Sequence, residues 1–158
     1  MADWQIDDAS YQHWINNVET PWRNNLELPD FDMAGDDSWP LISVVIPTYN
    51  TLPQFLDQAL ASILSQNYLK WELCIADDAS TDPDVREVIQ CYLDRDSRIR
   101  ATFREFNGGI AAATNSALAT AAGQYIAFMD HDDILPEYAL FLVAQEFRDH
   151  PGTRLLWH

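Results

Sequence analysis

The stretch "LISVVIPTYN", residues 41–50, decides the fold. Its first six residues form an apolar run rich in β-branched side chains, and a proline, a threonine, a tyrosine and an asparagine follow. A strand that is buried on both faces has this pattern, because helices cover both sides of a parallel sheet. The stretch therefore predicts a central strand that ends in a polar loop.

Strand-like and helix-like segments alternate through the rest of the chain. Further strands are predicted near residues 71–76, 98–103, where the pattern is weaker, 125–129 and 153–158. Apolar residues at helical spacing, or runs of small residues, fill the intervals at residues 55–64, 85–92, 110–122 and 140–147. Short connections between such segments predict an α/β fold, with a mostly parallel sheet and helices on both of its faces.

Capping signals predict where the helices begin. Thr51 and Gln54 fit a capping box, and Asp82 precedes a proline at the start of the next helix. Pro136 opens the last helix, and Ser10 is the expected N-cap of a helix near the N-terminus.

Residues 1–40 differ from residues 41–158, and we expect two regions with this boundary. The first region holds nine acidic residues, one basic residue and four of the six tryptophans. Its apolar stripe predicts a short helix followed by an extended arm, with the stripe formed by Tyr11, Trp14, Ile15 and Val18. The arm either packs on the main domain or docks a partner, a preceding domain or a second copy of the chain.

Composition limits the partners and the compartment. The 158 residues carry a net charge of −16, which argues against a nucleic-acid backbone or an anionic membrane as the main partner. Cys74 and Cys91 lie outside any CxxC pair and are expected to be buried free thiols. No signal peptide is visible, and polar residues interrupt the uncharged segment 107–129, so we expect a soluble, cytoplasmic protein without a transmembrane segment.

Polar groups follow each predicted strand, and these strand ends meet at one edge of a parallel sheet, where ligands bind. In "DHDD", Asp130 and Asp132 are two residues apart on an extended chain and point to the same side, away from His131. Two carboxylates together with phosphate oxygens suit Mg²⁺ or Mn²⁺. A solvated loop that caps the next helix explains "DHDD" equally well.

The other three edge segments allow similar pairs of interpretations. In "DDAST", Asp77 and Asp78 either accept hydrogen bonds from a base or ribose, or form a turn and an N-cap. Tyr49 either stacks on a base or lies on the rim, and "NGG" either approaches a ligand closely or forms a simple loop. The sequence contains no GxxxxGK[ST], GxGxxG, GxSxG or HExxH motif.

Four segments together resemble family-2 glycosyltransferases of the GT-A fold. These segments are "ISVVIPTYN", "WELCIADDASTD", "NGGIAAATNSAL" and "GQYIAFMDHDD", and they occur in the family's order and spacing from Ile42 to the C-terminus. Each motif is weak alone, but the four in order are specific. The variants in this chain are most similar to bacterial enzymes that build surface polysaccharide or lipopolysaccharide.

The resemblance implies an inverting, metal-dependent transfer of a sugar from a UDP- or dTDP-sugar to a saccharide or lipid-linked acceptor. By position, Tyr49 packs against the base while Pro47 and Thr48 shape that wall. Asp78, with Asp77 beside it, binds the imide of uracil or thymine.

The resemblance also implies roles for the third and fourth motifs. Asn107, Gly108, Gly109 and Asn115 belong to the donor site. In the DxD motif, Asp132 is the preferred ligand of Mn²⁺ or Mg²⁺, and Asp130 faces the ribose or the metal. Many relatives carry an arginine immediately before the asparagine of the third motif, where this chain has Thr114.

The family's general base is expected beyond His158, so no catalytic residue is assigned and the chain resembles a truncated donor-binding half. It could serve at the inner face of the membrane, within a larger or oligomeric enzyme. A nucleotide- and metal-binding fragment without transfer activity is the main alternative. A sugar nucleotidyltransferase is disfavoured because "PTYNTLPQ" lacks glycine and basic residues, and a receiver-like signalling module is disfavoured because no lysine follows Lys70.

Overall fold

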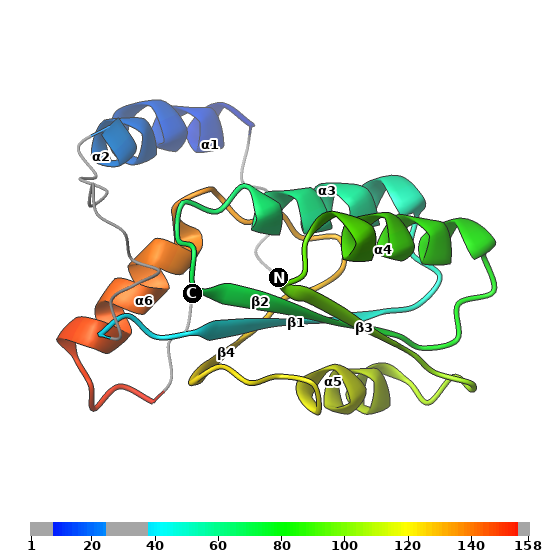
Figure 1. Ribbon diagram of the computed structural model, residues 1–158. Coiled ribbons are helices and arrows are strands. Elements are labelled where there is room, and N and C mark those ends of the chain that lie inside the picture. The colour runs from blue at the N-terminus through cyan, green and yellow to red at the C-terminus, as the bar shows by residue number, and fades with distance from the viewer. Residues whose placement is uncertain (1–7, 25–37, 155–158) are drawn as a thin grey trace, which may run out of the picture. The chain divides into compact units, whose positions relative to one another are not determined.

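The computed structural model describes residues 8–24 and 38–154. The chain divides into two compact units, Met1–Phe31 and Asp32–His158. In the first unit, helix α1 (Asp8–Trp14) continues into a π-helix, η1 (Ile15–Glu19), and a short helix α2 (Thr20–Asn24), as Figure 1 shows. Ser10 lies inside α1, so its prediction as an N-cap was wrong, and most of the expected extended arm lies outside the described residues.

The second unit contains a four-stranded sheet in which every pair is parallel. The strand order is β3-β2-β1-β4, so the apolar run that begins at Leu41 forms an inner strand. The strands are β1 (Ile42–Thr48), β2 (Trp71–Asp77), β3 (Ile99–Phe103) and β4 (Tyr125–Phe128). All seven residues of β1 and all seven of β2 are buried, as their apolar runs predict.

The edge strand β4 differs from the prediction of a fully buried strand. Its residues alternate between half-buried and exposed, and the side chain of Phe128 is 67% exposed. The cause is topological, because β4 pairs only with β1 among the described strands.

Helices cover both faces of the sheet, which confirms the predicted architecture. Figure 1 shows α3 (Pro53–Leu64) and α4 (Pro83–Arg95) on one face and α5 (Ile110–Leu118) on the other. Asp82 caps α4 by accepting a hydrogen bond from Asp84 N–H at 3.0 Å. The capping box at α3 was wrong, because the N-cap position belongs to Leu52 and no side chain caps this helix.

The last helix begins later than predicted. Helix α6 (Ala139–Asp149) starts three residues after Pro136. The Gln66 side chain joins it to the end of α3, because its amide donates to Ser62 O and Pro136 O and accepts from Leu140 N–H. The expected strand at 153–158 is not formed at Thr153 and Arg154, and its remaining residues lie outside the described part.

A buried polar cluster lies at the amino end of β1 and β2, away from the loops that carry the predicted site. Glu72 Oε1 accepts hydrogen bonds from Ser43 Oγ at 2.6 Å and from the N–H groups of Ala122 and Gly123. Its other oxygen pairs with Arg100 at 3.0 Å. The cluster thus provides a hydrogen-bond acceptor for the backbone N–H groups of the turn before β4. Small residues continue into this turn, although α5 ends at Leu118.

Two further expectations concern the thiols and the membrane. Cys74 is buried in the core, whereas Cys91 is exposed on α4, so the prediction of two buried thiols was wrong for Cys91. Within residues 8–24 and 38–154, no helix combines the length and the apolar character needed to cross a membrane.

Candidate functional site

The loops after β1 and β2 are joined to each other at the carboxyl edge of the sheet. Asn50 N–H donates to Ser80 Oγ at 2.9 Å, and the Asn50 side-chain oxygen accepts from Thr81 N–H at 2.8 Å. Asn50 and Ala79 both have positive φ angles, 46° and 61°, which are uncommon for residues other than glycine. Backbone conformations of this kind concentrate at ligand-binding and catalytic sites, where the surrounding contacts hold them.

Asp78 lies at the centre of this edge, where two backbone N–H donors and one guanidinium group contact its carboxylate. Gly108 N–H lies 3.0 Å from both carboxylate oxygens, and Gly109 N–H donates at 2.7 Å. The Arg104 Nε atom lies 2.7 Å from Asp78 Oδ1. The structure thus brings together two segments predicted for the site, "DDAST" and "NGG", and Asp78 itself is only 1% exposed.

These donors determine the protonation state of Asp78. Burial alone would raise the pKa of this carboxyl group. The N–H groups of Gly108 and Gly109 and the charge of Arg104 outweigh burial and hold the pKa below its ordinary value. Asp78 is therefore an ionised group that accepts hydrogen bonds and donates none.

Asp77 has a different environment although it is adjacent in sequence. Its carboxylate accepts hydrogen bonds from the backbone N–H and the hydroxyl of Ser80. These contacts form the turn that the sequence analysis gave as one of two interpretations of "DDAST".

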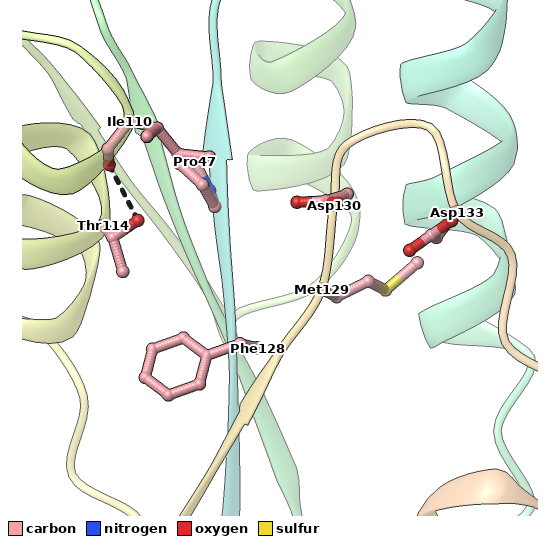
Figure 2. A pocket seen from close by; sticks show the side chains of 7 residues that line it. All are labelled: Pro47, Ile110, Thr114, Phe128, Met129, Asp130 and Asp133. Carbon is pink, nitrogen blue, oxygen red and sulfur yellow. Dashed lines mark hydrogen bonds between the residues drawn. The ribbon is translucent and has the colours of Figure 1, made fainter. Parts of the chain in front are cut away.

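A cleft of about 300 Å³ opens beside the loop that follows β4. Figure 2 shows Asp130 and Asp133 on this loop, with Pro47 of β1 and Thr114 of α5 across from them. The complete lining is Pro47, Ile110, Thr114, Phe128, Met129, Asp130 and Asp133. None of these seven residues is basic, so the cleft offers carboxylates and apolar surface to a ligand.

The carboxylates of "DHDD" are distributed differently from the prediction. Asp130 lines the cleft as expected, but its neighbour there is Asp133, whereas Asp132 is exposed and is not among the lining residues. The described residues contain no cluster of three or more Asp, Glu, His or Cys side chains able to hold a metal ion. Two carboxylates still fit Mg²⁺ or Mn²⁺, because these ions usually take one or two protein carboxylates and complete their coordination with phosphate and water.

The remaining predicted residues occupy varied positions. Tyr49 is 44% exposed at the end of β1, and Asn107 and Asn115 are also exposed. Thr48 is 2% exposed, and its hydroxyl has no hydrogen-bond partner among the described residues. Because side chains alternate along a strand, Thr48 faces the opposite side of the sheet from Pro47 in the cleft.

Residues 43–153 match the sequence profile described as "Glycosyl transferase family 2". The chain belongs to this family. The match covers β1 to β4 and helices α3 to α6, and so it includes every loop at the carboxyl edge of the sheet.

Curated relatives of this family-2 chain come from several bacteria. It is 48% identical over 118 residues to the uncharacterized protein y4gI of Sinorhizobium fredii, covering 75% of this chain and 13% of that protein. It is 38% identical over 118 residues to the O-antigen biosynthesis protein RfbC of Myxococcus xanthus, covering 75% and 9%. It is 43% identical over 94 residues to the putative teichuronic acid biosynthesis glycosyltransferase TuaG of Bacillus subtilis, covering 60% and 36%. The chain therefore spans a small part of these relatives.

Solved structures confirm the GT-A architecture. TarS residues 1–349 of S. aureus in complex with UDP-GlcNAc aligns with a TM-score of 0.65 and 28% identity, covering 70% of this chain and 32% of that chain. The mannosyltransferase PcManGT of Pyrobaculum calidifontis in complex with GDP-Man and Mn²⁺ aligns with a TM-score of 0.60 and 26% identity, covering 83% and 39%.

Sequence reasoning missed several residues of this family-2 site. Asn50 and Ser80 join two loops, Arg104 pairs with Asp78, and Asp133 and Phe128 line the cleft. A usable signal existed for Arg104, because it directly follows β3 and so lies at the same edge as the other motifs. The contribution of Asp133 depends on the turn after Asp130, where Asp133 N–H donates to Asp130 O at 3.3 Å.

Proposed function

We propose that this chain binds the donor of a glycosyltransferase that moves a sugar from a UDP- or dTDP-sugar to a saccharide or lipid-linked acceptor, with inversion, in polysaccharide or lipopolysaccharide synthesis. The observation that carries the proposal is the convergence, at the carboxyl edge of a family-2 sheet, of an ionised Asp78 and a cleft lined by Asp130 and Asp133. Ligands of open parallel sheets bind at this edge.

The charge of the cleft supports a metal-dependent donor site. A nucleoside diphosphate carries negative charge into a cleft that has two carboxylates and no basic side chain. Like charges a few ångströms apart repel, and a divalent cation between the carboxylates and the diphosphate removes this repulsion. We assign Asp130, which lines the cleft, and Asp132, two residues further along the same loop, as the residues that would hold Mn²⁺ or Mg²⁺, and Asp133 is the second carboxylate that lines the cleft.

The bound cation would supply Lewis-acid stabilisation of the diphosphate leaving group. The chain's own residues bind and orient the donor. Asp78 accepts a hydrogen bond from the base imide, and Pro47 and Tyr49 contact the base. The exposed "NGG" loop, residues 107–109, approaches the nucleotide, with Asn115 on α5 contributing to the same site.

The whole protein's setting follows from the same proposal. Its relatives are named for O-antigen and teichuronic acid synthesis. We infer a cytoplasmic location, at the inner face of the membrane where lipid-linked acceptors are presented, and an assembly with further domains or a second copy. The second candidate function is nucleotide and metal binding without sugar transfer. This alternative is favoured because Asp130 and Asp133 lie on one loop and no other acidic residue lines the cleft, so no separate carboxylate there could act as a general base.

The test is a melting-temperature titration with UDP, dTDP, GDP and ATP, each with and without Mn²⁺. At a ligand concentration of about 100 times Kd, binding adds about 2.7 kcal/mol to the free energy of unfolding. For a chain of this size we expect a rise of about 5 °C or more with UDP or dTDP in the presence of Mn²⁺. The rise should disappear in Asp130→Asn and Asp132→Asn.

Asp94→Asn is the matched control, because it removes an exposed carboxylate on α4 that only bonds Gln90 at 3.0 Å among the described contacts. It should respond like the wild type. A response that does not depend on Mn²⁺ would contradict the metal assignment. An equal response to ATP would contradict the base assignment.

A further inference from the structure

Arg104 contacts three separate parts of the donor edge. Its Nε atom pairs with Asp78 Oδ1 at 2.7 Å, and its Nη1 atom donates to Ala112 O at 3.1 Å and to Ser116 Oγ at 2.6 Å, both on α5. Its Nη2 atom lies so close to Gly108 that a Cβ added there would be 2.7 Å away. One side chain, 26% exposed, therefore links the end of β3, the "NGG" loop, α5 and Asp78.

We propose that Arg104 is a positioning residue of the donor site: its guanidinium, held by α5, pairs with the Asp78 carboxylate and keeps it fixed and ionised for a base that carries an imide N–H. This inference rests on the proposed function and adds a residue that sets base specificity. Arg104 acts through Asp78 and does not itself contact the nucleotide.

The hydrogen-bond capacity of a carboxylate gives the physical reason. A carboxylate has about four acceptor positions. The N–H groups of Gly108 and Gly109 donate to Asp78, and the Arg104 guanidinium lies against Oδ1 as an ion pair, so acceptor capacity remains on the carboxylate. Uracil and thymine offer an N–H at the imide, whereas cytosine offers a lone pair at the same ring position. A fixed and ionised Asp78 therefore favours uridine and thymidine nucleotides over cytidine nucleotides.

Arg104 is the charged group that favours ionised Asp78, in addition to the hydrogen bonds from the Gly108 and Gly109 N–H groups. Among the described contacts, Arg104 is the basic side chain against Asp78, and the one carboxylate adjacent to it, Asp77, is engaged by Ser80. Helix α5 carries no charged residue, and the segment "PTYN" at the end of β1 carries none either. Removing Arg104 therefore removes the positive charge that favours ionised Asp78.

The experiment measures Kd for UDP and for CDP, both with Mn²⁺, at about pH 7 and about pH 5. The ratio of the two values cancels titration of the metal site, because both ligands share the diphosphate and the cation. Wild-type protein should prefer UDP by about 10-fold or more at both pH values. Arg104→Met should lose most of this preference at about pH 5 and part of it at about pH 7.

Arg100→Met is the matched control. Arg100 lies on β3 and also pairs with a buried carboxylate, that of Glu72 on β2, but this pair lies at the opposite end of the sheet. It should keep the wild-type ratio at both pH values. Arg104→Lys should restore the preference at about pH 5, since it keeps the charge, but should bind UDP about 3-fold or more weakly, because lysine lacks the planar fork.

A folded Arg104→Met protein with the wild-type UDP-to-CDP ratio at both pH values would overturn this inference and leave the proposed function standing. Failure of the wild type to bind UDP would overturn both. If Arg104→Met does not fold, Arg104→Lys decides the question. Wild-type UDP affinity in Arg104→Lys overturns the proposal, and weaker binding with an unchanged melting temperature supports it.

Discussion

Replacing Asp78 with alanine is expected to lower the free energy of unfolding by about 3 kcal/mol and to abolish donor binding. The substitution leaves the Arg104 charge without its carboxylate and leaves the N–H groups of Gly108 and Gly109 without an acceptor. Removing one partner of a buried ion pair costs about 3 to 5 kcal/mol. We expect the lower end, because Arg104 is 26% exposed and can regain water. Urea unfolding at neutral pH measures the change.

Asp77→Ala is the control for this prediction, since it removes a carboxylate one residue away. Its described partner is Ser80, which lies in the same turn. The expected loss is about 1 kcal/mol, the usual contribution of a hydrogen bond. Equal losses in the two variants would contradict the central role that we give to Asp78.

Replacing Glu72 with alanine should cost about 2 to 4 kcal/mol, although Glu72 lies far from the donor site. Its carboxylate holds Ser43, the backbone of Ala122 and Gly123, and Arg100. Gly123 packs closely against the start of β1, since a Cβ added to it would lie 2.7 Å from Leu41 O and 2.8 Å from Ser43 N. Urea unfolding again gives the measurement, with Glu146→Gln on α6 as a control of little effect because its ion pair is exposed.

The Glu72 prediction has a defined pH dependence. Burial alone would raise the pKa of Glu72, but hydrogen bonds from Ser43, Ala122 and Gly123 and the charge of Arg100 hold it below its ordinary value. A carboxyl group whose pKa is lower in the folded state stabilises the fold above its unfolded pKa, about 4.3, and loses this effect as the pH falls through the folded pKa. The difference between wild type and Glu72→Ala should therefore be largest near neutral pH and shrink below about pH 4. A difference that grows in acid would contradict this account.

The sequence was most informative about the sheet. The runs that become β1 and β2 are mostly apolar because both faces of these strands are covered, and this pattern predicts buried parallel strands. The exposure of Phe128 could not be predicted in the same way, because it depends on which strands pair with β4. The predictions of helix N-caps succeeded in part. Asp82 caps α4 through the Asp84 N–H group, as predicted, whereas no side chain caps α3.

The site was predictable at the level of segments and less so at the level of atoms. Alternation of strands and helices places "DDAST", "NGG" and "DHDD" at one edge, and the structure joins the first two through Asp78. Which of Asp132 and Asp133 lines the cleft depends on the turn after β4, which spacing on an extended chain does not describe. Arg104 was missed because its role is visible only once β3 lies beside β2.

The most direct test of the account uses NMR to locate the donor on the ¹⁵N-labelled chain. UDP is added with substoichiometric Mn²⁺, and the broadening of each amide signal is measured against a reference sample that contains diamagnetic Mg²⁺. We predict that Mn²⁺ broadens the amide signals of residues 128–133 and 108–109, and only when UDP is present. The signals of Trp71 and Gly123 should stay sharp, since seven residues of strand place them about 20 Å away. Broadening centred on those amides or on residues 8–24, or broadening that does not depend on UDP, would contradict the assignment of the carboxyl edge as the donor site.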